Sequence, residues 1–219
     1  AAYQARCIES WRRHGFAVHS VHDESERDRL GAPPEGVNVI LARSDPAGRF
    51  PSNKPRLGQI LAAIAADGEA GGCVIANADI VLLESDGLPA WLNAQAAGAI
   101  VAAQRIDIAR PSDRHGSLYP FGFDLLAFDR RTLGAVGDAD MVLGEGWWDY
   151  WLPMAAMLAG ADLKIVDHPI AIHLQHARGI DETLWAAMGR HFGDWLAGAS
   201  EAAAAAGDDR ARQLAAQLS

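Results

Sequence analysis

Apolar positions in the first half of the chain alternate between strand-like and helix-like spacing. Residues 16–22 place apolar and polar side chains in turn, and residues 37–42 form a short β-branched run, so both segments are predicted strands. Apolar residues between Leu57 and Ile64 instead follow the i, i+3, i+4, i+7 spacing of an amphipathic helix, which we place at about residues 54–66. Residues 73–76 then form an apolar run of the buried-strand type. This alternation predicts parallel βαβ units.

The second half carries apolar runs that lie closer together, which predicts a mixed sheet. In the C-terminal tail, one apolar stripe runs from Trp185 to Leu196 and predicts a helix packed onto the sheet. Ala is the best helix former, so the Ala-rich residues 202–206 are interpreted as helix or linker. Two further helices are expected at 4–14 and 88–97, and residues 145–160 are expected to start in a Gly- and Trp-rich turn and continue as a helix. The remaining expected strands are 100–104, 123–128, 163–166 and 170–174.

Together these elements predict one α/β domain of Rossmann-like type. We expect a mixed, mostly parallel central sheet with helices on its flanks. The domain is expected to span residues 1–180, and residues 181–219 are expected to form a helical C-terminal tail that packs on the same domain.

Composition and charge narrow the function classes. The 219 residues include 19 Lys and Arg against 28 Asp and Glu, a net charge of −9, and such a surface repels phosphate backbones, so we expect no nucleic-acid partner. No apolar run approaches the roughly 20 residues that span a bilayer, so we expect no transmembrane segment. Cys7 and Cys73 lack the spacing of metal ligands and are interpreted as buried thiols in a reducing, cytoplasmic compartment.

The first candidate site is Asn77-Ala78-Asp79, at the end of an apolar strand. In an open α/β sheet, ligands bind at the carboxyl ends of the strands. An acidic residue there can hold a divalent cation, which in turn neutralises a pyrophosphate. Asn and Asp also form ordinary turns that end strands, so the motif alone leaves both interpretations open.

The second candidate is the aromatic segment 144–153, which holds three Trp and one Tyr. Flat apolar rings with polar edges suit the faces of sugar rings. Trp147, Trp148 and Trp151 are therefore candidate sugar-binding residues. In the alternative interpretation, the Trp side chains belong to the core.

The same segment contains two carboxylates, Glu145 and Asp149. A carboxylate beside a bound sugar can act as a general base. Alternatively, Asp149 caps a helix whose first turn contains Pro153. Both interpretations of Asp149 can hold together, because capping fixes the position of a carboxylate.

His173-Leu174-Gln175-His176 follows an apolar run and forms the third candidate. Neutral imidazole is a good ligand for manganese- or zinc-like ions. Residues three apart point to opposite faces of a strand, so in an extended segment only one of the two His can reach a given metal. A hydrogen-bonded structural His near the end of a strand is the alternative for each.

Lys54 and Arg56 are cationic candidates at the point where a loop enters a helix. Helix N-termini attract phosphates, and both side chains would add positive charge. The alternative is a loop fixed by Pro, with solvated cations. The sequence has no Walker loop, no G-x-G-x-x-G and no G-x-S-x-G, so P-loop phosphoryl transfer, dinucleotide redox chemistry and Ser hydrolysis lose support.

In this order, the segments resemble a glycosyltransferase of the GT-A fold over residues 4–178. The resemblance implies a GT-A-like domain that moves a sugar, with inversion, from a nucleotide-diphosphate sugar to an acceptor hydroxyl. It implies Mn²⁺ or Mg²⁺ as cofactor, a UDP-sugar as the favoured donor, and a carbohydrate or glycoconjugate as acceptor. The segments that carry it are N-K-P-R at 53–56, N-A-D-I at 77–80, G-F-D-L-L-A-F at 122–128, W-D-Y-W-L at 148–152 and H-L-Q-H at 173–176.

The resemblance also implies roles for single residues. In GT-A enzymes, a D-x-D motif holds the metal on the nucleotide diphosphate, a later acid serves as base, and a C-terminal His can complete the metal shell. Asn77 stands where that motif has its first acid, which removes one anionic ligand. The resemblance implies Asp79 with His173 or His176 as the metal ligands, and Asp149, or else Glu145, as the base. The implied nucleotide-binding residues are Lys54, Arg56, Asn77 and Asp79. The implied sugar-binding residues are Trp147, Trp148, Trp151 and Tyr119.

Two departures from the family pattern support other functions. Asn77 is one, and the other is that the sequence starts at the helix that in GT-A domains follows a nucleotide-binding strand. A non-catalytic GT-A-like domain that binds a glycan or a protein is therefore the alternative. A sugar-phosphate nucleotidyltransferase comes third, because such enzymes normally show a Gly-rich basic segment near the N-terminus, and none is visible here.

Overall fold

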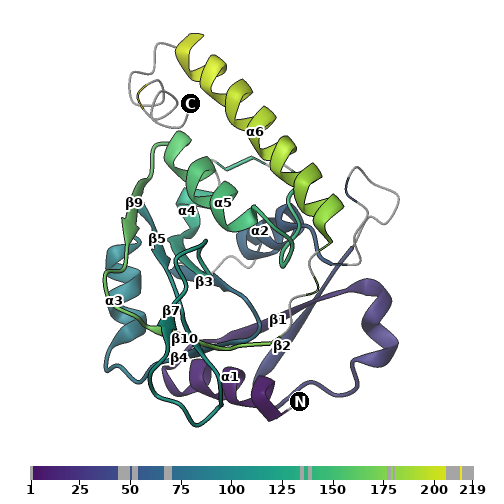
Figure 1. The fold of residues 1–219 in the computed structure, drawn as a ribbon, viewed down its shortest axis with the longest axis vertical. Helices are drawn as coiled ribbons and strands as arrows, with labels where there is room; N and C mark the ends of the chain where they lie inside the picture. The colour runs from purple at the N-terminus through teal and green to yellow at the C-terminus, as the bar shows by residue number, and fades with distance from the viewer. Residues whose placement is uncertain are drawn as a thin grey trace.

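The computed structural model describes residues 2–43, 50, 54–66, 71–133, 136–137, 140–176, 179, 181–205 and 213. Residues 51–53 of the expected helix entrance, 177–178 at the end of the resembling stretch, and 206–212 and 214–219 of the tail lie outside this set. Helix α1 lies at one end of the molecule and helix α6 at the other, with the sheets between them (Figure 1).

A four-stranded sheet in the order β3-β8-β5-β9 forms the centre of the structure. Strand β8 runs antiparallel to both of its neighbours, β3 and β5, whereas β9 runs parallel to β5. The strands are β3 (Gly72–Ala76), β8 (Leu125–Asp129), β5 (Ala99–Ala103) and β9 (Asp162–Ile165).

Helices cover both faces of this sheet. Along β5, Ile100 and Ala102 pack into one apolar cluster and Val101 and Ala103 into another, because successive strand residues point to opposite faces. Burial on both faces explains why β5 is continuously apolar instead of alternating. One cluster includes residues of α2 (Leu57–Ala66), α5 (Trp148–Leu158) and α6 (Glu182–Ala205), and the other includes residues of α3 (Leu88–Gln95).

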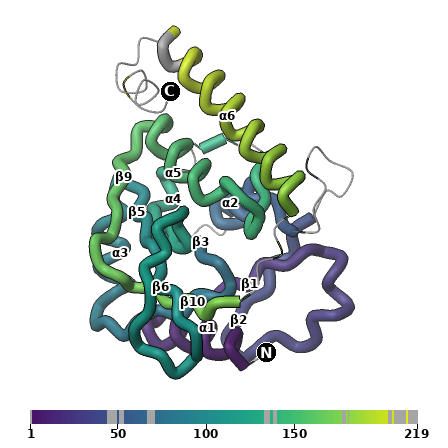
Figure 2. The backbone as a smooth tube through the Cα atoms, viewed as in Figure 1, coloured from purple at the N-terminus to yellow at the C-terminus, as the bar shows by residue number. Residues whose placement is uncertain are grey.

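A second sheet, in the order β4-β10-β6-β7, carries most of the polar residues discussed below. Strand β10 lies between β4, to which it is antiparallel, and β6, to which it is parallel. The tube view shows β10 and β6 side by side (Figure 2). These strands are β4 (Ile80–Leu82), β10 (Ala171–Leu174), β6 (Ile106–Ile108) and β7 (Ser117–Leu118), and α1 (Ala2–Arg13) packs against β4.

The remaining strands, β1 (Val18–Asp23) and β2 (Val37–Ala42), form a separate parallel pair. A 3-10 helix, η1 (Glu24–Arg29), follows β1. Asp23 caps η1 by accepting the N–H of Ser25 at 2.9 Å. A short helix, α4 (Arg130–Leu133), follows β8.

The α/β class with a mixed sheet is confirmed, but the expectation of mostly parallel strands is wrong. Strand β8 lies between β3 and β5 and runs in the direction opposite to both, so two of the three described strand pairs of the central sheet are antiparallel. Strands β4, β6 and β7 were not predicted, since runs of two or three residues are too short for apolar periodicity to reveal.

The helix expected at 54–66 begins at Leu57. The residues before it pair with another segment instead: Arg56 forms an antiparallel bridge with Val142, and the carbonyl of Pro55 accepts the N–H of Leu143 at 3.1 Å. Lys54 and Arg56 therefore precede the helix and are not part of its first turn.

Helix α6 packs against α5 through the predicted apolar stripe. Met188 is fully buried, and Phe192 is partly buried against the same cluster. Trp185, at the start of the stripe, remains 46% exposed. The stripe therefore faces the core over its central turns and is open at its N-terminal end.

Among the described residues, no helix combines the length and apolarity that a bilayer crossing requires. Both cysteines carry free thiols, with Cys7 buried and Cys73 partly buried. Burial raises the pKa of the Cys7 thiol to about 11, so this thiol is protonated at neutral pH.

Replacing Met188 by Ala tests whether α6 unfolds together with the sheet. Loss of a fully buried Met side chain is expected to lower the free energy of unfolding by about 2–5 kcal/mol, and urea unfolding followed by circular dichroism should show one transition. Arg190→Ala, on the exposed side of the same helix, is the control and should change stability by less than about 0.5 kcal/mol. An unchanged midpoint for Met188→Ala would contradict this packing.

Candidate metal and catalytic site

Three potential metal ligands meet beside β10. In the strand register, His173 lies opposite Ile80 of β4 and opposite Asp107 of β6. Asp79 directly precedes Ile80, so this register brings its carboxylate to the imidazole of His173. His176 follows two residues after the end of the strand and reaches the same carboxylate.

The ligand atoms of Asp79, His173 and His176 all lie within 4.8 Å of one another. Each His places its Nε2 atom 3.1 Å from Oδ2 of Asp79. The His173 side chain is 6% exposed, that of Asp79 37% and that of His176 57%, so the group opens to solvent on the His176 side. Burial raises the pKa of Asp79, but hydrogen bonds from both His lower it more, and the net pKa lies well below the usual range.

This donor set fits a divalent cation. Two imidazole nitrogens and one ionised carboxylate converge, and the solvent-facing side leaves room for further ligands. Mg²⁺ prefers oxygen ligands, whereas imidazole suits transition metals, so the set fits an ion such as Mn²⁺ better than Mg²⁺. The expectation for an extended segment does not apply: β10 ends at Leu174, His176 lies beyond the strand, and both His reach one carboxylate.

Asn77 points into a different part of the polar network. Its side-chain amide donates to Oδ1 of Asp124 at 2.7 Å. Its N–H also bonds to the carbonyl of Asp124, at 3.1 Å. Asn77 therefore connects the ends of β3 and β8, and the triad of Asp79, His173 and His176 does not include it.

Asp149 lies in the first turn of α5, whose N-cap is Trp147, so the expectation that Asp149 is the cap is wrong. Its Oδ2 accepts the N–H of Phe123 at 3.1 Å. Burial raises the pKa of Asp149 to about 6, although backbone hydrogen bonds oppose the shift. Pro153, expected in the first turn, lies inside the helix. A carboxylate with a pKa of about 6 is mostly ionised at pH 7 and can still accept a proton.

Trp148 and Trp151 belong to the core, as the alternative interpretation held. They are 2% and 1% exposed and pack among the residues of α5, α6 and the central sheet. Neither ring presents a face to a ligand, which corrects their place among the sugar-binding candidates. Residues 148 and 151 lie about one helical turn apart, so both point to the buried face of α5.

Trp147 and Tyr119 are partly exposed, and both are held by neighbours. The indole N–H of Trp147 donates to the carbonyl of Trp185 at 3.0 Å, and the two rings lie 4.8 Å apart. Trp147 itself has a left-handed backbone, with φ 77°. Tyr119 lies under the guanidinium of Arg105, whose Cζ is 4.2 Å from the ring centroid.

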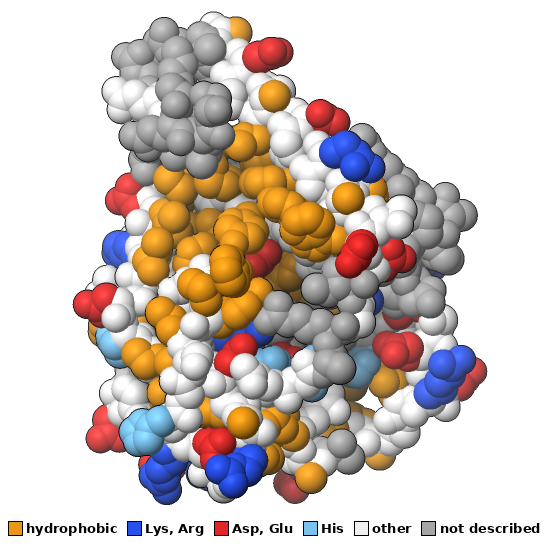
Figure 3. All heavy atoms as spheres, viewed as in Figure 1, with side chains coloured by type: hydrophobic (Ala, Val, Ile, Leu, Met, Phe, Trp, Pro, Cys, Tyr) orange, Lys and Arg blue, Asp and Glu red, His pale blue; other side chains and the backbone are white. Residues whose placement is uncertain are grey.

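Three exposed aromatic side chains belong to, or contact, the segments that also hold the sequence-predicted sugar-binding residues. Tyr150 and Trp185 are among the exposed large apolar residues, and Phe121, next to Tyr119, is 67% exposed. Apolar side chains gather over α5 and α6 on the face shown in Figure 3. Asp149, the candidate base, belongs to the first turn of α5.

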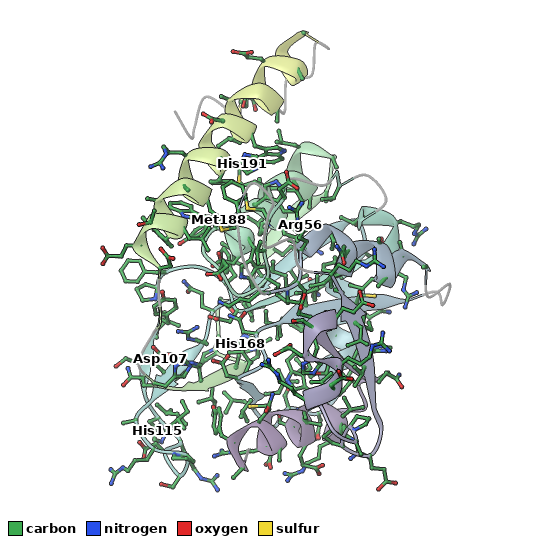
Figure 4. All side chains as sticks on the ribbon, turned by 90° about the vertical axis from the view of Figure 1, so that its right-hand side faces the viewer. Arg56, Asp107, His115, His168, Met188 and His191 are labelled. Atoms are coloured by element: carbon green, nitrogen blue, oxygen red, sulfur yellow. The ribbon has the colours of Figure 1, made fainter. Side chains whose placement is uncertain are left out.

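The two cationic candidates are engaged by acids. Lys54 lies 3.1 Å from Oε1 of Glu145 and donates to the carbonyl of Gly144 at 2.6 Å. Arg56 pairs with Asp140. In Figure 4, Arg56 lies at the level of Met188 and well above Asp107, which contacts His173. The structure therefore does not bring Arg56 to the metal candidates.

Two residues beside the metal candidates, Arg105 and Asp107, were not predicted from the sequence. Arg105 is buried between Asp107 and Asp124, and Asp107 contacts His173. Burial raises the pKa of Asp107, but hydrogen bonds from Arg105 and His173 lower it more, so the net pKa is below the usual value. The available signal was the alternation Arg105-Ile106-Asp107-Ile108, a short strand pattern with two charges on one face.

The comparisons with known proteins bear on the fold. No protein-family model matches the chain, and no curated protein matches its sequence. Among solved structures, it resembles GalNAc-T7 with UDP, GalNAc and Mn²⁺, at 12% sequence identity and a TM-score of 0.50. The fold is GT-A-like. The match covers 82% of this chain and 42% of the GalNAc-T7 chain, so it extends over less than half of that protein.

Gly122 is expected to be essential for the position of Asp149. At φ +79°, a Cβ added to Gly122 would lie 1.9 Å from Oδ2 of Asp149, so Gly122→Ala must displace the carboxylate from the N–H of Phe123. Gly98→Ala is the matched control, because Gly98 has φ +68° and a Cβ there meets nothing within 4 Å. In urea unfolding, backbone strain should lower the free energy of unfolding of Gly98→Ala by about 1–2 kcal/mol, and that of Gly122→Ala should fall by more. Equal losses would mean that the carboxylate moves away without cost.

Proposed function

We propose that this protein transfers a sugar from a nucleotide-diphosphate sugar to the hydroxyl of a carbohydrate or glycoconjugate acceptor, with a divalent cation as cofactor. The observation that carries the proposal is the convergence of Asp79, His173 and His176 next to strand ends of a GT-A-like fold. Ligands of open α/β sheets bind at such strand ends.

Asp79, His173 and His176 are the proposed ligands of the cation. A bound divalent cation would neutralise charge on the diphosphate as it leaves. The low pKa of Asp79 keeps its carboxylate ionised, and Mn²⁺ is favoured over Mg²⁺ by the two imidazoles. The solved structure of GalNAc-T7 contains UDP and Mn²⁺, which supports UDP as the first nucleotide to test.

Asp149 is the proposed general base. It would accept the proton of the acceptor hydroxyl while the acceptor oxygen bonds to the anomeric carbon and the bond to the diphosphate oxygen breaks. Attack from the side opposite the leaving group inverts the anomeric configuration. Glu145 is the weaker candidate, because its carboxylate already pairs with Lys54.

The exposed aromatic rings are the proposed acceptor surface. Tyr119 and Trp147 remain from the sequence-based candidates. Tyr150 and Phe121 join them because both rings are exposed: Tyr150 follows Asp149 in the chain, and Phe121 lies in edge-to-face contact with Tyr119. Aromatic faces pack well against the C–H faces of pyranose rings.

A second candidate function is binding of a glycan or protein without catalysis. The ion pairs of Lys54 with Glu145 and of Arg56 with Asp140 favour it, because a phosphate would have to compete with both acids for these cations. The contact of Asn77 with Asp124, away from the triad, also favours it. Metal-dependent nucleotide binding separates the two functions.

Thermal unfolding with UDP, GDP and CDP, each with and without Mn²⁺, tests donor binding. A nucleotide at a hundred times its dissociation constant adds about 2.7 kcal/mol, which raises the midpoint by roughly 5–10 °C in a domain of this size. We expect a shift with UDP that requires a divalent cation, is largest with Mn²⁺ and is absent in Asp79→Ala. Mg²⁺ in place of Mn²⁺ should give a smaller shift. No shift with any nucleotide would favour the non-catalytic function.

The proposed base predicts a specific pH dependence. Because Asp149 must be ionised to accept a proton, the transfer rate should fall as pH drops through its raised pKa, about tenfold per unit below pH 6. Asp149→Asn should lower the transfer rate about 10²–10⁴-fold and leave UDP binding unchanged. The product made by the unmodified protein, analysed by NMR, should have the inverted configuration at the anomeric carbon. A rate loss in Glu145→Gln in place of Asp149→Asn would assign the base to Glu145.

A further inference from the structure

A buried arginine holds two carboxylates next to the candidate metal ligands. The side chain of Arg105 is 8% exposed, its Nε donates to Oδ1 of Asp107 at 2.7 Å, and its other side pairs with Asp124. Tyr119 covers the guanidinium. Buried charges are stable only when paired, so Arg105 and its two carboxylates form one unit with fixed geometry.

Asp107 also contacts His173. The same Oδ1 atom that bonds to Arg105 lies 2.9 Å from Nδ1 of His173. A carboxylate that is paired with a guanidinium is ionised and only accepts hydrogen bonds, so Nδ1 of His173 is the donor in this contact. In the neutral imidazole, Asp107 and Asp79 compete for the one ring proton, and Asp107 is the closer of the two, at 2.9 Å from Nδ1 against 3.1 Å from Nε2. A proton on Nδ1 leaves the lone pair of Nε2 for a cation.

The strand register makes this arrangement a property of the fold. Asp107 and His173 are direct partners in the parallel pair β6–β10, so their side chains lie on the same face of the sheet. On the other side of the ring, Nε2 of His173 points to Asp79 at 3.1 Å. The imidazole is thus fixed at both nitrogens, with Nε2 aimed at the candidate metal site.

We propose that Asp107, held by Arg105, is a positioning residue that fixes the tautomer and orientation of His173 for metal binding. A carboxylate on the second nitrogen of a metal-binding His orients the ring and raises its basicity. The use of the metal rests on the proposed function, whereas the tautomer of His173 does not. Metal binding by His173 and the fixed tautomer of His173 can therefore be tested separately.

Asp107→Asn tests the proposal, with Asp124→Asn as the matched control. Each substitution removes one of the two ion pairs of Arg105, and only the first removes the carboxylate from His173. Mn²⁺ affinity, measured by electron paramagnetic resonance of free Mn²⁺, should fall about 10–100-fold in Asp107→Asn and stay within about threefold in Asp124→Asn. Equal losses in the two variants would overturn the proposal, because they would show a general effect of disturbing Arg105.

A second measurement needs no metal. The ¹⁵N chemical shifts of the His173 ring are measured in the metal-free protein, at a pH high enough that they no longer change with pH. These shifts report which ring nitrogen carries the proton. The proposal expects protonated Nδ1 in the unmodified chain and in Asp124→Asn, and a mixture of tautomers in Asp107→Asn. A predominance of protonated Nε2 in the unmodified chain would overturn it. A protein that binds no Mn²⁺ but shows the expected shifts would contradict the proposed function and leave the role of Asp107 supported.

Discussion

The candidate site depends on the register of β10 between β4 and β6. This register places His173 opposite Asp107 on one side and next to Asp79 on the other. A slip of one residue along either neighbour would turn every side chain of β10 to the opposite face of the sheet and separate His173 from both acids. The slip would also expose Ile172, which is buried, so the apolar cluster beneath the sheet holds the polar residues in place.

Three aspartates near the site, Asp79, Asp107 and Asp149, differ in pKa because their neighbours differ. Asp79 and Asp107 have partners that stabilise the charged form, namely two imidazoles for the first and Arg105 with His173 for the second. Asp149 has backbone N–H partners and a buried environment, so its pKa is raised to about 6. The structure thus contains one carboxylate, Asp79, that can hold a cation and another, Asp149, that can accept a proton, which is the division of roles that the proposed sugar transfer requires.

The two parts of the site rest on separate apolar clusters. The candidate metal ligands lie at the β4-β10-β6-β7 sheet, which packs against α1, whereas Asp149 lies on α5, which packs against α6. Asp124 connects them: it pairs with Arg105 on the metal side and directly follows Phe123, whose N–H holds Asp149. Trp147, in a left-handed conformation that non-Gly residues rarely adopt, is held by its contacts with α6. Packing of the C-terminal helix therefore bears on the segment that leads into Asp149.

The sequence by itself was enough to predict the strand at 37–42, most of the amphipathic helix placed at about 54–66, and the strand that ends at Leu174, because apolar periodicity is a local property. Only the tertiary structure decided which polar residues meet. The contact between Asp107 and His173 joins residues 66 apart in the chain, and the pairing that creates it involves strands too short to leave a periodic signal. Trp148 and Trp151 also show this limit, since an aromatic ring has the same sequence signature in a core as on a sugar-binding surface, and only the helix packed against it determines whether the ring is exposed.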